Sequence, residues 1–400
     1  MPTPARRAST LLAVVAAALP LACGAPRTDA TNAPALTPWP ERAYDATELE
    51  LLALMHEHHV PGLAAALVHD GAITRSYALG WADVERRVPV EPDTLFQLAS
   101  ISKTVTATVV MQLVERGAID LDADVGRYLP FALRHPVHPD VPITPRMLLT
   151  HSSSIRDDWD VLEGTWVQDR DYPLTLAESM EAYFTPSGRF WSPEENFEEW
   201  APGERTEYCN VAFALLAYVA ERAAGEPFET LVRERVLEPL DLEGGFRLHE
   251  VDVARVAKPY VLEEGDRLVS PGHHAYLDFP SGTLRLSAID LATFLCAYQC
   301  GGELRGARIL RPDTVAAMLT VQDAALDPDQ GLAWYRSDAL DDAAGDRGDG
   351  DWWGHDGGDP GVATQMLWDR DSGDGVVLLV NTEPEDWAIE TALLEALLRR

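Results

Sequence analysis

Ser100 and Lys103 are the residues of this chain whose types and spacing most directly suggest chemistry. Only two of the 32 basic residues are lysines, Lys103 and Lys258, and the first follows a serine at the spacing Ser-x-x-Lys. Arginine stays protonated and cannot act as a base, whereas a buried lysine can lose its proton. Random placement would give below about 0.1 such pairs in a chain with so few lysines. The pair therefore predicts a serine nucleophile with a lysine amine as its base.

Residues 101–115 are expected to form a buried helix that begins directly after Ser100. The stretch is rich in β-branched side chains, which suit a buried helix, and Gly117 offers a C-terminal stop. Residues three apart share a helix face, so the Ser100 hydroxyl and the Lys103 amine would meet at the positive end of the helix dipole. This describes an activated serine with a general base. An N-cap serine followed by a chance lysine is the alternative.

A second segment, residues 202–210, supplies a phenol and a carboxamide. Tyr208 and Asn210 flank one residue just before a strongly apolar helix expected over 211–223. Alternate side chains of an extended backbone point the same way, so both could enter one cleft, with Tyr208 as a proton carrier and Asn210 as a donor to a substrate amide. Taken alone, the segment would favour a plainer interpretation, with Tyr208 as core packing and Asn210 as a helix N-cap.

A third segment, residues 352–361, surrounds His355 with glycines. So many glycines allow a backbone to approach a ligand closely. The N–H groups of this segment could pair with that of Ser100 to hold an oxyanion. His355 could bind a carboxylate or polarise the network formed by the first two segments.

The three segments, in this order and at these separations, resemble the superfamily of serine β-lactamases and penicillin-binding proteins. The resemblance is strongest to the branch that contains class C β-lactamases, D,D-carboxypeptidases, D-aminopeptidases and related esterases. It covers roughly residues 45–398 and is supported by the stretches 142–152 and 281–292. No single motif is specific, but the combination is.

The resemblance implies a role for each matching residue. Ser100 resembles the acylated nucleophile, and Lys103 resembles the amine that takes its proton. Tyr208 is similar to the tyrosine that relays a proton to the leaving group and activates water for deacylation, and Asn210 looks like the substrate-amide contact. The backbone amides of Ser100 and Gly358 would form the oxyanion hole. The other substrate-binding positions would lie on the same glycine-rich strand as Gly358, namely His355, Asp356 and Gly357.

Two departures from the family pattern bear on the substrate. His355 stands where β-lactamases have a lysine, as in many members of the esterase and peptidase branch, so a permanent cation for the substrate carboxylate is missing. Residues 156–200 are long and acidic, and we interpret them as a lid or cleft edge that sets specificity. The sequence therefore predicts a hydrolase that acts on esters or amides rather than an efficient β-lactamase.

The order of strand and helix patterns predicts an α/β fold with an all-α lobe. One antiparallel sheet would be built from both chain ends and flanked by helices, with a helical region inserted within about residues 105–300 of a 45–398 domain. A cleft between the two parts would be the natural site. The expected strands are 63–70 and 73–81, which form a hairpin, then 331–336, 363–369 and 376–381, followed by a last helix over 387–398.

The N-terminus predicts export. Residues 1–22 have a basic start and a short apolar run, as a signal peptide does, and they resemble a bacterial lipoprotein signal cleaved before Cys23. Pro20 stands where an aliphatic residue is usual, and ordinary signal-peptidase cleavage nearby is the alternative. Residues 23–44 are rich in Ala, Pro and Thr and are expected to form a flexible tether. The protein would be periplasmic or anchored to the outer membrane through lipid on Cys23, and otherwise secreted.

The formal net charge of −33 argues against nucleic acid or anionic membrane surfaces as partners, which leaves a small-molecule or peptide substrate. No cofactor or metal is expected, because residues 56–59 miss the zinc-protease spacing and the acidic loop 338–351 does not fit a calcium loop. Cys296 and Cys300 could form a strained disulfide or stay reduced. Two functions remain, an exported serine hydrolase or a non-catalytic peptidoglycan- or peptide-binding protein on the same fold.

Overall fold

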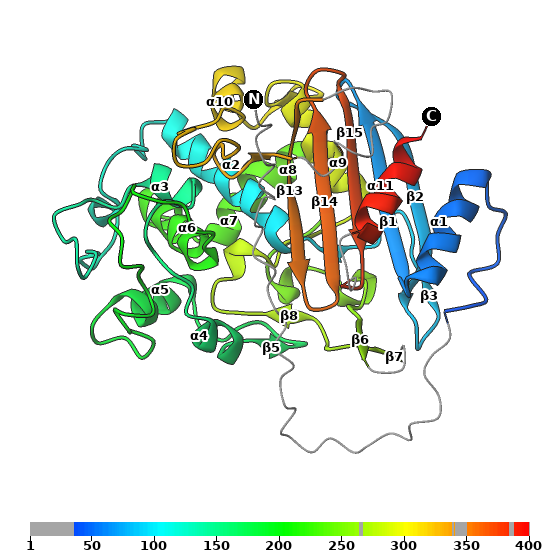
Figure 1. Ribbon diagram of the computed structural model, residues 1–400, viewed down its shortest axis with the longest axis horizontal. Helices are drawn as coiled ribbons and strands as arrows, with labels where there is room; N and C mark the ends of the chain where they lie inside the picture. The colour runs from blue at the N-terminus through cyan, green and yellow to red at the C-terminus, as the bar shows by residue number, and fades with distance from the viewer. Residues whose placement is uncertain (1–35, 264–266, 338–339, 341–349, 384–387, 400) are drawn as a thin grey trace, which may run out of the picture. The chain divides into compact units, whose positions relative to one another are not determined.

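The computed structural model describes residues 36–263, 267–337, 340, 350–383 and 388–399. Within them, the two ends of the chain form one antiparallel sheet of seven strands, in the order β12-β13-β14-β15-β1-β2-β3 (Figure 1). The strands are β1 (Gly62–His69), β2 (Ala72–Asp83), β3 (Val88–Pro89), β12 (Tyr335–Arg336), β13 (Trp352–Asp359), β14 (Val362–Asp369) and β15 (Asp374–Val380). The sheet confirms the predicted α/β fold.

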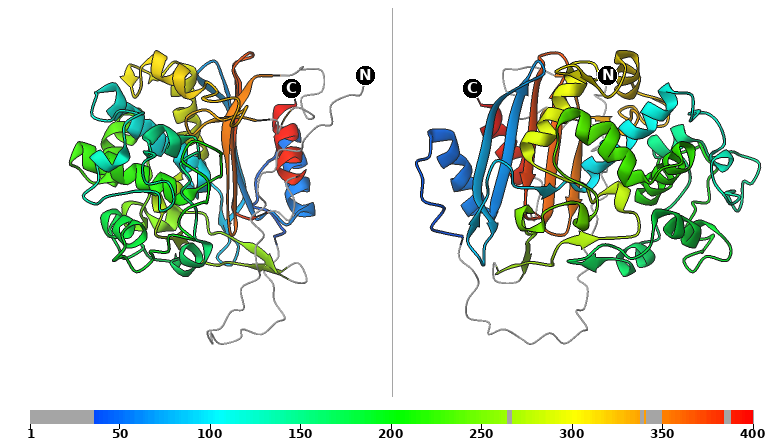
Figure 2. Two further views of the ribbon diagram at one scale, coloured as in Figure 1. Left: turned by 60° about the vertical axis from the view of Figure 1, so that its left-hand side comes forward. Right: turned by 180° about the vertical axis from the view of Figure 1, so that it is seen from behind.

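Both faces of the sheet are covered by helices. Helices α1 and α11 pack on one face, and the other described helices belong to the opposite side (Figure 2). The helices are α1 (Ala46–Glu57), α2 (Ser102–Glu115), α3 (Pro145–Leu149), α4 (Trp159–Gly164), α5 (Leu176–Phe184), α6 (Asn210–Ala224), α7 (Phe228–Val232), α8 (Glu238–Leu240), α9 (Ala288–Gln299), α10 (Pro312–Met318) and α11 (Ala388–Leu398). The predicted last helix is therefore confirmed over its described residues, whereas α1 was not foreseen.

Strand β15 shows why its sequence is apolar throughout. Val376, Leu378 and Val380 join the cluster that contains α1 and α11, while Val377 and Leu379 join the cluster on the opposite face. Successive side chains of a strand point to opposite faces, so a strand covered on both sides needs an unbroken apolar run. The same reasoning applies to β1, which lies between β15 and β2.

Helix α2 is buried as the sequence predicts. Every side chain from Ser102 to Leu113 is buried. Its threonines remain compatible with burial because their hydroxyls are bonded to carbonyl oxygens, Thr106 to that of Pro280 at 2.8 Å and Thr108 to that of Thr104 at 2.8 Å. Gly117, just beyond the helix, has a φ of +70°, a conformation that glycine adopts without strain.

The region between the two halves of the sheet is less purely helical than the sequence suggests. Short strands pair within it, and one pair joins the acidic 156–200 stretch to residues before α9. The pairs are β4 (Phe96–Gln97) with β9 (Arg285–Leu286), β5 (Val167–Gln168) with β8 (His274–Ala275), β6 (Val261–Glu263) with β7 (Arg267–Val269), and β10 (Glu303–Leu304) with β11 (Ala307–Arg308). At 331–336 only Tyr335 and Arg336 form a strand, because Gly331 N bonds to Trp334 O and closes a turn.

Several predictions made for the chain's first residues lie outside the described part, namely the signal peptide 1–22 and the lipid acceptor Cys23. The end of the predicted tether is described, and it packs on the domain: Leu36 is buried and its carbonyl oxygen accepts a bond from Trp81 Nε1 at 2.8 Å. Most of the acidic loop 338–351 also lies outside the described residues. In the part of the chain that is described, no helix is long and apolar enough to cross a membrane.

Candidate active site

Ser100 lies in a strained turn between β4 and α2. It is the middle residue of the short 3-10 helix η1 (Ala99–Ile101), which leads directly into α2. Ala99 before it has a φ of +45°, in the left-handed region that favours glycine. Non-glycine residues in that region cost free energy and concentrate at functional sites. The turn places the Ser100 side chain, which is half-buried, at the N-terminus of a fully buried helix.

Lys103 is buried and points back at Ser100, as the spacing predicts. Its Nζ donates to Ser100 Oγ at 3.0 Å, to Asn210 Oδ1 at 2.8 Å and to the Ser281 carbonyl oxygen at 2.9 Å. Three acceptors match the three donors of an ammonium group. Burial nevertheless lowers the pKa of Lys103 to about 8, against the opposing effect of the nearby carboxylates, of which Asp278 is the strongest. The amine can therefore lose its proton near neutral pH.

Tyr208 completes the contact around the serine. The Ser100 side chain lies close enough to its hydroxyl to act on the pKa of the phenol, and Lys103 Nζ lies 4.9 Å from the centre of its ring. Although 42% of the Tyr208 side chain is exposed, the surrounding protein removes water from the hydroxyl and raises its pKa well above the usual value. The group is thus a phenol that can donate a proton, and Lys103 is the better base of the two.

Asn210 is held at both ends of its carboxamide. Its Oδ1 accepts from Lys103, and its Nδ2 donates to Asp157 Oδ2 at 2.9 Å. Asp157 also accepts the backbone N–H groups of Asn210 and Val211, at 2.9 Å each, and so caps α6 from outside that helix. Asn210 is the first residue of α6 rather than its N-cap, which is Cys209. The carboxamide that the resemblance assigns to the substrate therefore orients Lys103 in this structure.

Strand β13 passes directly beside Ser100. A Cβ atom built on Gly357 would lie 2.8 Å from Ser100 N and 2.6 Å from Leu98 O, so only glycine allows this approach. Thr364 Oγ1, from the neighbouring strand β14, donates to Leu98 O at 2.8 Å and joins the same two segments. Gly358 follows on the strand and is exposed. The close approach that the glycines predicted is present, and it brings the predicted oxyanion strand to Ser100.

His355 and Asp356 are turned into the protein. His355 is 2% exposed, its Nδ1 lies 2.6 Å from the Asp356 carbonyl oxygen, and burial lowers its pKa to about 4. The imidazole is therefore neutral at pH 7 and offers no cation to a substrate carboxylate. The Asp356 carboxylate accepts from the Tyr335 hydroxyl, and the Asp356 N–H donates to the same hydroxyl at 2.9 Å. Neither His355 nor Asp356 therefore offers a positive charge to an anionic substrate.

His151 is a site residue that the sequence did not single out. Its ring stacks on Tyr208 with 4.3 Å between ring centres, and its Nδ1 accepts from Cys209 N at 3.1 Å. An accepting Nδ1 identifies the neutral tautomer that carries its proton on Nε2. Burial and the nearby Lys103 charge hold the pKa of His151 well below its usual value. His151 therefore supports the Tyr208 ring without adding charge.

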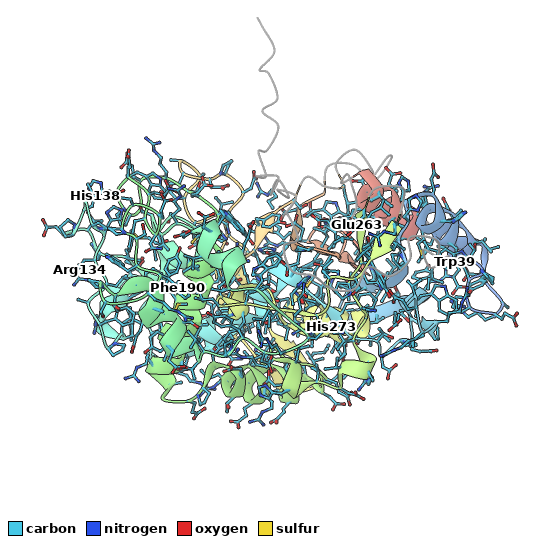
Figure 3. All side chains as sticks on the ribbon, turned by 90° about the horizontal axis from the view of Figure 1, so that it is seen from below. Trp39, Arg134, His138, Phe190, Glu263 and His273 are labelled. Carbon is cyan, nitrogen blue, oxygen red and sulfur yellow. The ribbon has the colours of Figure 1, made fainter. Side chains whose placement is uncertain are left out.

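The 156–200 stretch reaches the site at two points. Asp157 caps α6, as described above, and Trp166 stacks on Tyr276 with 5.7 Å between ring centres. The pairing of β5 with β8 places Trp166 there, and it also brings the Trp166 ring to within 5.3 Å of the His274 ring centre. Figure 3 shows His273, next to β8, between the helical side marked by Phe190 and the side marked by Trp39. The stretch is thus part of the site wall.

Comparisons with known proteins agree with this geometry. The Beta-lactamase family model matches residues 45–399. Esterase EstB of Burkholderia gladioli is 30% identical over 371 residues, which cover 83% of this chain and 88% of the esterase. Penicillin-binding protein 4 of Amycolatopsis lactamdurans is 29% identical over 339 residues, 82% of this chain and 83% of that protein.

Solved structures show the same fold. The octameric penicillin-binding protein homologue from Pyrococcus abyssi superposes with a TM-score of 0.70 at 26% identity, covering 88% of this chain and 76% of that one. The D-amino acid amidase from Ochrobactrum anthropi, in its complex with L-phenylalanine amide, superposes with a TM-score of 0.68 at 22% identity, covering 88% and 99%. At that identity the second likeness concerns the fold alone.

Proposed function

The chain belongs to the Beta-lactamase family and is a hydrolase of that family, and on this premise we propose that it cleaves esters or amides through an acyl-enzyme on Ser100. The observation that carries the proposal is the contact of 3.0 Å between Lys103 Nζ and Ser100 Oγ, made by an amine with a pKa of about 8. An amine that is partly neutral at working pH, within hydrogen-bond reach of a hydroxyl, meets the geometric and chemical conditions for a general base.

The reaction follows from the positions of these groups. Neutral Lys103 takes the proton of Ser100 Oγ as that oxygen bonds to the substrate carbonyl carbon. The negative charge that develops on the carbonyl oxygen is held by the backbone N–H groups of Ser100 and Gly358. The bond to the leaving group then breaks, and Tyr208 supplies the proton that the departing alkoxide or amine requires. Lys103 returns a proton to Tyr208, and the acyl group stays on Ser100.

Deacylation reverses these roles with water. The Tyr208–Lys103 pair takes a proton from a water molecule as the water oxygen bonds to the acyl carbon. The bond from that carbon to Ser100 Oγ then breaks, the pair returns the proton to Ser100 Oγ, and the carboxylic acid is released. Asn210 and the Ser281 carbonyl oxygen hold Lys103 in place during both halves. Preorganised partners of this kind avoid reorganisation at the moment of reaction.

The substrate class follows from the charge of the site. A β-lactam carries a carboxylate, and the residue at the position that would receive it, His355, is neutral because burial lowers its pKa to about 4. The esterase relative, 30% identical, supports the choice of ester substrates. We therefore expect short p-nitrophenyl esters to be turned over faster than nitrocefin, and the opposite ranking would refute this use of His355.

Covalent labelling tests the acyl-enzyme. A fluorophosphonate should raise the intact mass of the full chain by one adduct, and Ser100→Ala should abolish both the adduct and ester hydrolysis. Ser102→Ala is the matched control, because Ser102 lies two residues away but its hydroxyl accepts from Leu284 N at 3.1 Å inside the protein. If the wild type forms no adduct, and Ser100→Ala and the wild type do not differ in ester hydrolysis, the result would favour a non-catalytic binding protein on this fold.

A further inference from the structure

Asp359 ends strand β13, four residues after His355, and forms part of the rim beside Ser100. One of its oxygens, Oδ2, accepts from Gln97 Nε2 at 2.6 Å and from the Tyr276 hydroxyl at 3.0 Å. None of the described residues donates a hydrogen bond to the other oxygen, Oδ1. The carboxylate is thus fixed in one orientation by two donors while retaining an acceptor oxygen.

The partners of Asp359 place it close to the nucleophile. A Cβ atom built on Gly282 would lie 2.0 Å from the Tyr276 hydroxyl and 3.7 Å from the carbonyl carbon of Ala99, the residue before Ser100. Gly282 also follows Ser281, whose carbonyl oxygen accepts from Lys103. The charge of Asp359 is felt at Lys103, whose pKa it raises. The Asp359 carboxylate therefore lies near the reacting groups.

In the described part of the chain, the cationic groups packed nearest to Asp359 and its partners are buried. Arg285 is fully buried, and its Nη atoms donate to the carbonyl oxygens of Phe246, Thr283 and His274 and to Gln97 Oε1. His274 is buried with a lowered pKa, its Nε2 lying 2.9 Å from the Pro360 carbonyl oxygen. Lys103 is also buried, behind Ser100. None of these three groups forms an ion pair with the Asp359 carboxylate, whose hydrogen-bond partners are Gln97 and Tyr276.

We infer that Asp359 is a specificity-determining residue that binds a protonated amine of the substrate, so that the natural substrates are esters or amides with an ammonium group near the scissile carbonyl. The inference rests on the proposed serine hydrolase function and names its substrate class. An ammonium group would fill the vacant acceptor position of Asp359 with a charge-assisted hydrogen bond. The apolar wall formed by Trp166 on Tyr276 would exclude water from that bond and strengthen it.

Three anilides of matched size test the inference. Alanine p-nitroanilide carries an ammonium group, propionyl p-nitroanilide lacks it, and succinyl p-nitroanilide carries a carboxylate instead. The wild type should hydrolyse one enantiomer of the alanine compound with a kcat/KM about 10- to 100-fold above that of the propionyl compound, with the succinyl compound slowest. Equal rates, or a preference for the carboxylate, would overturn the inference without any variant.

Asp359→Asn then assigns the preference to this residue. The substitution keeps the shape and one acceptor for Gln97 and Tyr276 but removes the charge, so the alanine and propionyl compounds should be hydrolysed at similar rates. Glu57→Gln removes the same charge from α1, on the other face of the sheet, and should leave the preference unchanged. A preference that survives in Asp359→Asn would also overturn the inference.

Two other assays test the proposed function itself, namely fluorophosphonate labelling and p-nitrophenyl acetate hydrolysis. In the wild type both should occur whatever the role of Asp359, because neither reagent carries an amine. If the wild type shows neither, the hydrolase proposal fails. If it shows both without preferring the ammonium substrate, only the role of Asp359 fails.

Discussion

The two faces of the sheet bury different kinds of side chains. On the face covered by α1 and α11 the core is a cluster of apolar residues, beside which the carboxyl group of Glu390 is buried. The opposite side buries Lys103, Asp157, Asp278 and Arg285 among its apolar residues. Buried charges cost free energy unless they are paired and hydrogen-bonded. The difference indicates that the face covered by α1 and α11 mainly stabilises the fold. The opposite side buries charged groups around Ser100 and Lys103 at a cost in stability.

The charged side reduces this cost by giving each buried charge at least one hydrogen-bond partner. Lys103 has three acceptors, and Asp157 accepts two backbone N–H groups, the Asn210 amide and the Cys209 thiol. Asp278 accepts from Ser281 Oγ at 2.8 Å, and burial raises its pKa to about 7. A network in which every member is bonded is rigid, so it can hold the nucleophile and base in one arrangement.

Replacing the amine of Lys103, on the side with the buried charges, should have the largest effect on activity. Lys103→Met preserves the length of the side chain and removes the base, so kcat/KM for p-nitrophenyl esters should fall about 10²- to 10⁴-fold. Wild-type kcat/KM should rise with pH through about 8, because Lys103 acts when its amine is neutral. Stopped-flow assays between pH 6 and 9.5 would measure both effects.

Lys103→Arg is the companion to Lys103→Met, because a guanidinium keeps the charge yet cannot act as a base. Both variants should lose activity, with circular dichroism confirming that they fold. Activity within tenfold of the wild type in Lys103→Met would contradict the assignment of Lys103 as the base.

Truncating the apolar face should change stability and leave catalysis unaffected. Leu393 of α11 is 1% exposed and packs in the apolar cluster, so Leu393→Ala should lower the free energy of unfolding by about 2 to 5 kcal/mol. Leu49→Ala, in α1, is the control because that side chain is 56% exposed and should cost below about 0.5 kcal/mol. Urea unfolding gives the first quantity and ester hydrolysis at 25 °C the second. A change in kcat/KM beyond threefold in Leu393→Ala would show that the two faces are coupled.

Glu390 tests a buried carboxyl group of the apolar face. Its Oε2 accepts from Gln365 Nε2 at 2.6 Å, no described residue bonds to Oε1, and burial raises its pKa to about 8. The folded state therefore holds a proton that the unfolded state releases near pH 4.5, and stability falls as pH rises through this window, by up to about 1.4 kcal/mol per pH unit. Glu390→Gln should remove this loss. Parallel stability curves for the two proteins at pH 5, 6.5 and 8 would contradict the burial of a neutral carboxyl.

The sheet and the nucleophile's helix could be predicted from the sequence because their signals are local. The apolar runs of β1 and β15 and the Ser-x-x-Lys spacing each lie within a few residues. Helix α1 was missed although Asp45 and Glu48 form a reciprocal capping box at its start. That pattern of Asp followed three residues later by Glu is visible in the sequence and was the signal to use.

The rest of the site depends on tertiary contacts that leave no local trace. Asp157 and Asp359 are two of the 65 acidic residues of the chain, and nothing near them in sequence separates them from a surface carboxylate. His151 is stacked on Tyr208 only because the loop before α4 returns to α6. The partner that holds Asn210, Asp157, likewise comes from a distant segment.

The position of β1 in the sheet constrains how the protein can be made. β1 pairs with β15, and the bonded residues His69 and Asp374 are 305 residues apart. On the ribosome, the first hairpin therefore has an open edge until β15 has emerged, and contacts of such long range form slowly. Gly357 likewise packs against Ser100 only after β13 has emerged. A nascent chain that ends before β13 therefore carries Ser100 without the strand that lies beside it, and we expect hydrolytic activity only after these strands are made.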